Sequence, residues 1–346
     1  MDRAERQGVT AALIAAAIFG ATAPVAKQLL EHSGIAALSF LLYLGGFVAL
    51  SVAARLRGPS SEAGLRRGDV PALAAISLIG GIAGPLLLLV GLRRTSGIAG
   101  SLLLNLEAPL TLLLALALFG EHLSRRMVLA AATVFVGAGF VTVDPGPSYA
   151  TVAGATAIAG ACVAWALDNN LTQRLALRDP VRLVQVKAGA AAVGLGTISV
   201  ATGSRFPTWS YAALAAAVGA VGYGLSIVLD VRALRLIGAA RESALFATAP
   251  LVEAVVAMPL LAERPTAGIV AASVLMGVGV AAFIRESHEH RHVHEPLDHE
   301  HFHEHDEHHR HDHPDAAPAE HSHAHHHDPT AHAHPHASDA HHRHSH

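Results

Sequence analysis

The 346-residue chain is poor in cysteine, charge, aromatic residues and lysine. Its one cysteine, Cys162, excludes a disulfide within the chain and a metal site built from thiols. Charged residues make up 15% of the chain, below the roughly 25% of an average soluble domain. Aromatic residues make up only 5%, so aliphatic and small residues supply the apolar character. A soluble domain with a polar surface is therefore disfavoured, and we expect no nucleic-acid partner.

The chain also lacks the sequence signatures of common catalytic and nucleotide-binding sites. No nucleophile elbow, P-loop or dinucleotide-binding glycine pattern stands between a predicted strand and a helix. We therefore expect no enzyme, no required cofactor and no use of ATP.

The chain does contain a series of apolar runs of about 20 residues. A helix of that length spans the ~30 Å hydrocarbon core of a bilayer. These runs predict an all-α membrane protein with ten transmembrane helices, at residues 9–30, 35–54, 70–92, 97–119, 127–143, 151–171, 181–202, 211–231, 242–261 and 267–284. The partner of such a body is the lipid bilayer.

Arginine and lysine are unevenly distributed among the short loops. With the N-terminus inside, the inner segments hold 15 of these residues and the outer loops four. Because positive residues favour the cytoplasmic side, we expect both termini in the cytoplasm. The high alanine, glycine and arginine content suggests a bacterial source, and hence the inner membrane.

Two segments of the chain resemble each other about 141 residues apart. RTSGIAGSLLLNLEAPLTLLLALALFGEHLS (94–124) and RLIGAARESALFATAPLVEAVVAMPLLAERPT (235–266) share an arginine, Ala-Pro-Leu and a closing glutamate. Likewise FGATAPVAKQLL (19–30) precedes WALDNNLTQRLA (165–176) by 146 residues. Because each copy has an odd number of spans, five, the two copies must lie in opposite orientations across the membrane. This arrangement is the inverted 5+5 repeat typical of secondary transporters.

These motifs resemble the EamA type of the drug/metabolite transporter superfamily. The resemblance rests on FGATAPVAK, on Ala-Pro-Leu with the following Gly-Glu, and on AERPT, and it covers residues 9–284. It implies a permease with two EamA repeats around a central cavity, which we place at 1–147 and 148–285. It implies transport of a small solute, often outward, without naming the solute. The DNNLT run (168–172) and the histidine-rich end depart from the commonest pattern.

The first candidate site centres on Glu107, a carboxyl within a predicted span. Such groups cost ~2.5–3.5 kcal/mol to insert and need a reason to be there. Pro109 cannot donate a hydrogen bond to the carbonyl of Asn105, which leaves an acceptor near the carboxyl. The group could bind a coupling proton, a cation or an amine; alternatively, Glu107 is structural and bonds to a neighbouring helix.

A second candidate site follows Trp165 in the sixth predicted span. Asp168, Asn169 and Asn170 point in directions 100° apart on a helix, so some of them face protein or a cavity. We expect Asp168 and Asn169 to line the cavity, with Trp165 as a wall. The alternative is that this stretch is merely the cytoplasmic end of the helix.

Other polar residues within the predicted spans extend the list of candidates. Lys187 is a candidate partner for Asp168 or Glu107, and Glu253 lies beside the proline of the second repeat. Tyr223 is a further candidate for the cavity wall. Lys27 could reach the outer membrane surface, and Asp230 is expected to form an ion pair at the cytoplasmic face.

Residues 286–346 have a different composition, with 24 histidines, 13 acids and three bases. Almost no aliphatic residues are present, so no core can offset chain entropy, and we expect a disordered His/Asp/Glu-rich cytoplasmic tail. In an extended chain, histidines at i and i+2 share a side. Imidazole suits Ni, Co, Zn and Cu, and the candidate ligands are His288, His290, His292, His294, His299, His301, His303, His305, His308, His309, His311 and His313. The alternatives are a pH-responsive tail, or metal binding that has no bearing on transport.

The sequence as a whole predicts a secondary transporter that exports a small organic solute by proton or substrate-gradient coupling, with a metal-binding regulatory tail. The alternatives are a divalent-metal transporter for Ni, Co or Zn, and a membrane-tethered metal buffer or sensor. Against metal transport, the spans contain no histidine or methionine cluster. Whether the protein forms a homodimer is left open.

Overall fold

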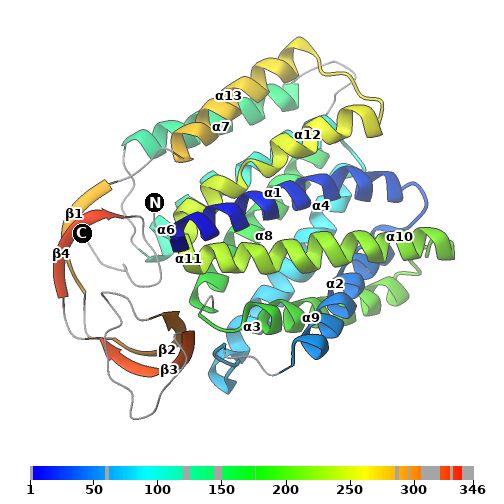
Figure 1. Cartoon of the computed structure of the whole chain (residues 1–346). Helices are drawn as coiled ribbons and strands as arrows, with labels where there is room; N and C mark the ends of the chain where they lie inside the picture. Colours follow the sequence, from blue (N-terminus) through cyan, green and yellow to red (C-terminus); the bar gives the residue numbers. More distant parts are fainter. Residues whose placement is uncertain are drawn as a thin grey trace.

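The computed structural model describes residues 3–58, 62–119, 125–143, 150–175, 177–284, 288–294, 297–304, 320–327 and 330–336. Its body is a bundle of long apolar helices (Figure 1). Within the described residues, nine helices are long and apolar enough to cross a membrane, and a shorter apolar helix covers Ala267–Ala282. The predicted all-α membrane body with ten spans is thereby confirmed.

The first five spans are built from helices α1 to α7. Two of these spans are interrupted: the third changes from α to π geometry and back, and the fourth passes through a 3₁₀ turn before Pro109. Their bounds are α1 (Arg3–Leu29), α2 (Ile35–Arg57), η1 (Arg67–Asp69) with α3 (Val70–Ile76), η2 (Ser77–Ala83) and α4 (Gly84–Leu92), α5 (Gly97–Leu103) with η3 (Leu104–Leu106) and α6 (Glu107–Phe119), and α7 (Arg125–Val143).

The second five spans are built from helices α8 to α13. Helix α11 contains a break at Gly238, where φ is +74°, a conformation that favours glycine. The break separates the eighth span from the ninth, so the eighth runs to Gly238 and the predicted end at residue 231 was too early. The bounds are α8 (Val152–Thr172) with η4 (Gln173–Leu175), α9 (Pro180–Ala201), α10 (Trp209–Gly219) with η5 (Ala220–Leu225) and α11 (Ser226–Phe246), α12 (Ala249–Leu260) and α13 (Ala267–Ile284).

Helix packing follows the internal repeat. Helix α1 packs on α11 and α12, and its counterpart α8 packs on α4 and α6. The pairs α2–α9 and α7–α13 join equivalent helices of the two halves (Figure 1). This is the arrangement expected of two copies related by a twofold axis.

The two π-helical segments occupy equivalent places in the two halves. Segment η2 lies in the third span, and η5 lies in the eighth, its counterpart. A Cβ on Gly80 in η2 would lie 2.3 Å from the Asp168 Cγ, and one on Gly222 in η5 would lie 2.3 Å from the Thr22 Oγ1. Thr22 and Asp168 are themselves equivalent at the 146-residue offset. Each π segment thus brings a glycine against the other half of the molecule.

Many large apolar side chains lie on the outside of the bundle, as a bilayer requires. Val193 is 72% exposed, Leu129 66% and Val274 62%. No membrane-sized hydrophobic surface of this kind would be stable in water. The protein is therefore a multi-pass membrane protein.

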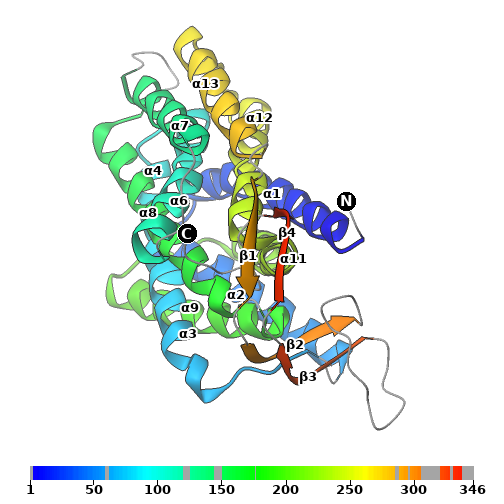
Figure 2. The same cartoon turned by 90° about the vertical axis from the view of Figure 1, so that its left-hand side faces the viewer.

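The two ends of the bundle are tied by different polar contacts. At the end where α1 begins, here called the N-side, ion pairs join distant segments: Arg57–Asp179, Arg178–Asp69, Arg235–Glu62 and Arg241–Glu5. At the opposite end, the far side, Gly97 and Ile98 donate their backbone N–H groups to Glu263 at 2.6 and 2.8 Å, which caps α5. Helix α13 ends at the N-side, where α1 begins (Figure 2).

The described parts of the tail are extended. Strand β1 (His288–His294) pairs antiparallel with β4 (Thr330–His336), and β2 (Leu297–Glu304) with β3 (Glu320–His327). The register places His292 opposite His332 and His301 opposite His323. The sequence predicts a tail with no fold of its own. The two pairings are isolated two-stranded ladders, and such ladders are marginally stable at best in water.

Candidate functional site

Two adjoining pockets lie where the two halves of the bundle meet. The first lies between α6 and the α11–α12 segment and comprises about 420 Å³, and the second lies among α1, α8, α9 and α11 and comprises about 640 Å³, open solvent included in both. Four residues line both pockets: Phe19, Glu107, Asn169 and Phe246. The pockets therefore form one candidate transport site.

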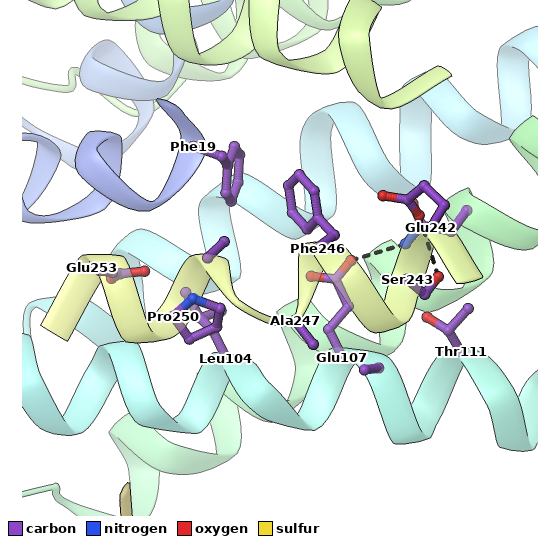
Figure 3. Close-up of a pocket in the computed structure, with 13 residues that line it drawn as sticks. Phe19, Leu104, Glu107, Thr111, Glu242, Ser243, Phe246, Ala247, Pro250 and Glu253 are labelled. Carbon is purple, nitrogen blue, oxygen red and sulfur yellow. Dashed lines mark hydrogen bonds between the residues drawn. The ribbon is translucent and has the colours of Figure 1, made fainter. Parts of the chain in front are cut away.

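Glu107 lines both pockets and so lies at their junction, and Figure 3 shows it in the first pocket. It begins α6 just after the 3₁₀ turn Leu104–Leu106, where the regular helical pattern is interrupted. The Asn169 Nδ2 donates a hydrogen bond to the Glu107 Oε1 at 2.9 Å. The carboxyl thus has a neutral amide partner from the other half of the protein.

Asp168 and Lys187 form a buried ion pair in the second pocket. The Lys187 Nζ donates to the Asp168 Oδ2, and both residues are 5% exposed. Of the two partners anticipated for Lys187, Asp168 and Glu107, the structure shows Asp168. Trp165, one turn before Asp168, donates its indole N–H to the Gly80 carbonyl of η2 at 3.1 Å. Helix α8 is thereby fixed against the π segment.

Glu253 and Glu242 extend the row of carboxyls along the first pocket. Figure 3 shows Glu253, Glu107 and Glu242 in succession along the helices that line it. Glu253 is 2% exposed and lies near the hydroxyl of Ser101 of α5, which donates to the Gly97 carbonyl at 2.7 Å. Glu253 follows Glu242 by eleven positions, over the end of α11 and the start of α12, which corresponds to about 16 Å of helical rise.

Asp230 lies against Glu242, which corrects the ion pair expected for it at the cytoplasmic face. Asp230 lines the second pocket and Glu242 lines the first, and the two carboxyls are close enough to influence each other electrostatically. The two carboxyls thus place two acidic groups next to each other where the pockets meet.

Three polar residues singled out in the sequence do not line the pockets. The Asn105 Nδ2 donates to the Leu102 carbonyl at 3.1 Å, and the Asn170 Nδ2 donates to the Thr111 and Ala166 carbonyls at 3.1 and 2.8 Å. Both amides thus donate to backbone carbonyls, so these two members of the candidate sites do not reach the pockets. Lys27 donates to the Leu92 and Thr95 carbonyls at 2.7 and 2.5 Å and caps the end of α4.

Two further candidates from the sequence line the second pocket, and several other lining residues were not singled out. Tyr223 lines the second pocket from η5, and Trp165 is part of its wall. Glu242, Phe19 and Phe246 were not predicted. Glu242 stands at the start of the ninth predicted span, so in the sequence it resembles an ordinary charged residue at a helix end. The two phenylalanines look like any apolar span residue, because every face of these helices is apolar.

The structure gives no support for a metal site in the described part of the chain. No group of three or more His, Cys, Asp or Glu residues there could hold a metal ion. The predicted ligands His288 to His294 lie in β1, and His299, His301 and His303 lie in β2. His305, His308, His309, His311 and His313 lie outside the described residues.

Comparison with known proteins identifies the family. The model of the EamA-like transporter family matches residues 6–143 and 152–285, one match in each half. The chain belongs to the EamA-like transporter family.

As an EamA-like transporter, the chain has a curated relative in Methanothermobacter thermautotrophicus, named an uncharacterized transporter. The two are 29% identical over 216 residues, which cover 60% of this chain and 62% of that protein. Less than two thirds of the relative is thus matched. A crystal structure described only as that of a protein has a TM-score of 0.62 at 20% identity, over 82% of this chain and 99% of its own, which shows a shared fold.

Proposed function

We propose that this EamA-like transporter is a secondary transporter that exports a small organic solute in exchange for protons. The observation that carries the proposal is the set of carboxyls lining the two joined pockets: Glu107, Asp168, Asp230, Glu242 and Glu253. Buried ionisable groups within a membrane are costly and mark solute paths or proton relays.

Glu107 is the group that the proposal places at the centre of coupling. It is the only carboxyl that lines both pockets among the described residues. A proton on Glu107 removes its charge, and a solute that binds there would displace that proton. Exchange of proton for solute at one carboxyl makes the two fluxes depend on each other.

The alternative of divalent-metal transport has weaker support in the body of the protein. The described pockets hold no metal-binding group of three, and Asp168 is already bonded to Lys187. We propose metal binding for the tail instead, whose histidines would bind Ni, Co, Zn or Cu on the cytoplasmic side.

Everted membrane vesicles test the proposal with a panel of amines, amino acids, carboxylates and divalent metals. We expect proton-dependent uptake of at least one organic solute, abolished by a protonophore and by Glu107→Gln. Glu31→Gln, an exposed carboxyl at the far side, is the matched control and should leave uptake unchanged. Uptake of a metal alone, dependent on Glu107, would replace the organic-solute proposal with the metal alternative.

A further inference from the structure

The second pocket is lined by more aromatic rings than the composition of the chain would suggest. Only 5% of residues are aromatic, yet five of them line this one space: Phe19, Tyr43, Trp165, Tyr223 and Phe246. The Phe19 ring lies 5.5 Å from that of Phe246 and 5.9 Å from that of Trp165, centroid to centroid. The Tyr43 and Tyr223 rings are 4.9 Å apart. The rings come from five different helices and form a continuous aromatic wall.

The charge balance of the joined pockets is negative. Five carboxyls and one lysine line them, and no arginine does among the described lining residues. Lys187 is committed to Asp168. Glu107 has only an amide partner, and Glu253 only a hydroxyl. A carboxylate of a ligand would therefore find no free cationic partner, whereas a ligand cation would find several acceptors.

One further polar group in the first pocket has no partner. Thr111 is 4% exposed and lines the pocket beside Glu242, and its Oγ1 has no hydrogen-bond partner in the described part of the chain. A buried polar group without a partner destabilises the fold. It is an unused acceptor near the carboxyls, suited to an N–H donor from a ligand.

We propose that the site binds an organic cation, a protonated amine or quaternary ammonium carrying an aryl or alkyl body. Its charge lies between Glu107 and the faces of Phe19 and Phe246, and its apolar body lies against Trp165 and Tyr223. A cation over an aromatic face is attracted to the ring electrons, and the attraction is stronger when water is excluded. An inorganic ion has no apolar body that could pack against an aromatic wall. The inference rests on the proposed function and names its solute class.

Four probes that share a phenyl ring and differ in charge test the inference. They are 2-phenylethylammonium, its N,N,N-trimethyl derivative, phenylalanine and 3-phenylpropionate, titrated into the purified full-length protein in detergent. The readout is the emission of Trp165 in a Trp209→Phe background, because Trp209 is the second of the two tryptophans and is 87% exposed. We expect both cations to bind at least tenfold more tightly than phenylalanine or phenylpropionate.

Variants show whether the binding occurs at this site. Glu107→Gln should weaken binding of both cations tenfold or more, Phe246→Leu should weaken it severalfold, and Glu31→Gln should leave it unchanged. Each variant is compared at equal monodispersity, and Phe246→Leu keeps the test valid if Glu107→Gln does not fold.

Three results would overturn the inference: tighter or equal binding of phenylalanine or phenylpropionate, no binding of either cation at millimolar concentration, or cation binding that neither Glu107→Gln nor Phe246→Leu weakens. These results would leave the proposed function standing if the vesicle panel still finds a proton-dependent solute of another class. Absence of any proton-dependent flux would instead remove the proposed function.

Discussion

Asp168 and Lys187 illustrate how a buried charge is tolerated at the scale of single residues. Both lie within the spans, both are 5% exposed, and each is the ion-pair partner of the other. A buried pair gains little over an apolar pair, because removing two charges from water costs about as much as their attraction returns. The pair is therefore better explained by a role in the site than by stability.

Removing either partner of this pair should destabilise the protein more than removing both. Asp168→Asn and Lys187→Met each leave one buried charge unpaired, at a cost of about 3–5 kcal/mol. The double variant leaves none and should recover most of the loss. Thermal unfolding of the four proteins in one detergent measures this cycle. A loss in the double variant equal to the sum of the two single losses would show that the two residues do not interact.

The identity of the site residues was only partly predictable from sequence. Glu107, Asp168 and Lys187 stood out because charged residues are rare in apolar runs. Asn105 and Asn170 stood out as polar amides within apolar runs, but they bond to backbone carbonyls. Polarity marks a residue that needs a partner, and it cannot tell whether that partner is a ligand or the backbone. Phe19 and Phe246 gave no signal, because an apolar span has no polar face to contrast with them.

At the scale of helices, the spans themselves were predicted well because hydrocarbon thickness fixes their length. What hydropathy could not give is the internal geometry of the third and eighth spans. Their π segments contain closely spaced glycines, in GGIAG (80–84) and GAVGYG (219–224), but the same pattern also fits an ordinary helix contact. A π turn widens the helix locally and leaves carbonyls available, and the Gly80 carbonyl accepts from both Trp165 and Tyr43.

Gly80→Ala should disturb the site through this close contact. The new Cβ would lie 2.3 Å from the Asp168 Cγ, so Asp168 must move away from Lys187 or α8 must shift. We expect a loss of about 1–3 kcal/mol together with reduced transport. Gly139→Ala in α7, where a Cβ meets nothing within 4 Å, is the matched control and should be neutral or slightly stabilising. Equal behaviour of the two variants would refute the close packing of η2 on α8.

At the scale of the whole molecule, the repeat organises both the fold and the site. The two halves contribute equivalent helices to each main contact, and the pockets lie where they meet. The N-side carries the arginines of the ion pairs Arg57–Asp179, Arg178–Asp69 and Arg235–Glu62. We expect this side to be cytoplasmic, because arginine-rich loops are retained there.

The tail provides a test of both orientation and metal binding. Sealed everted vesicles should bind ⁶³Ni, whereas sealed right-side-out vesicles should not, because the tail follows α13 on the N-side. Cutting the chain after Arg285 should remove this binding and leave solute uptake in place. Binding to right-side-out vesicles would reverse the proposed orientation, and binding that survives the cut would place the metal elsewhere.

The most direct test of proton-coupled export is a count of protons in a purified system. Proteoliposomes that enclose a pH-sensitive dye are given a transported solute from the vesicle panel, with no other ion gradient imposed. The account predicts that entry of solute is accompanied by exit of protons, and that Glu107→Gln loses this coupled movement while Glu31→Gln keeps it. Solute entry without proton movement, or coupling unchanged in Glu107→Gln, would contradict it.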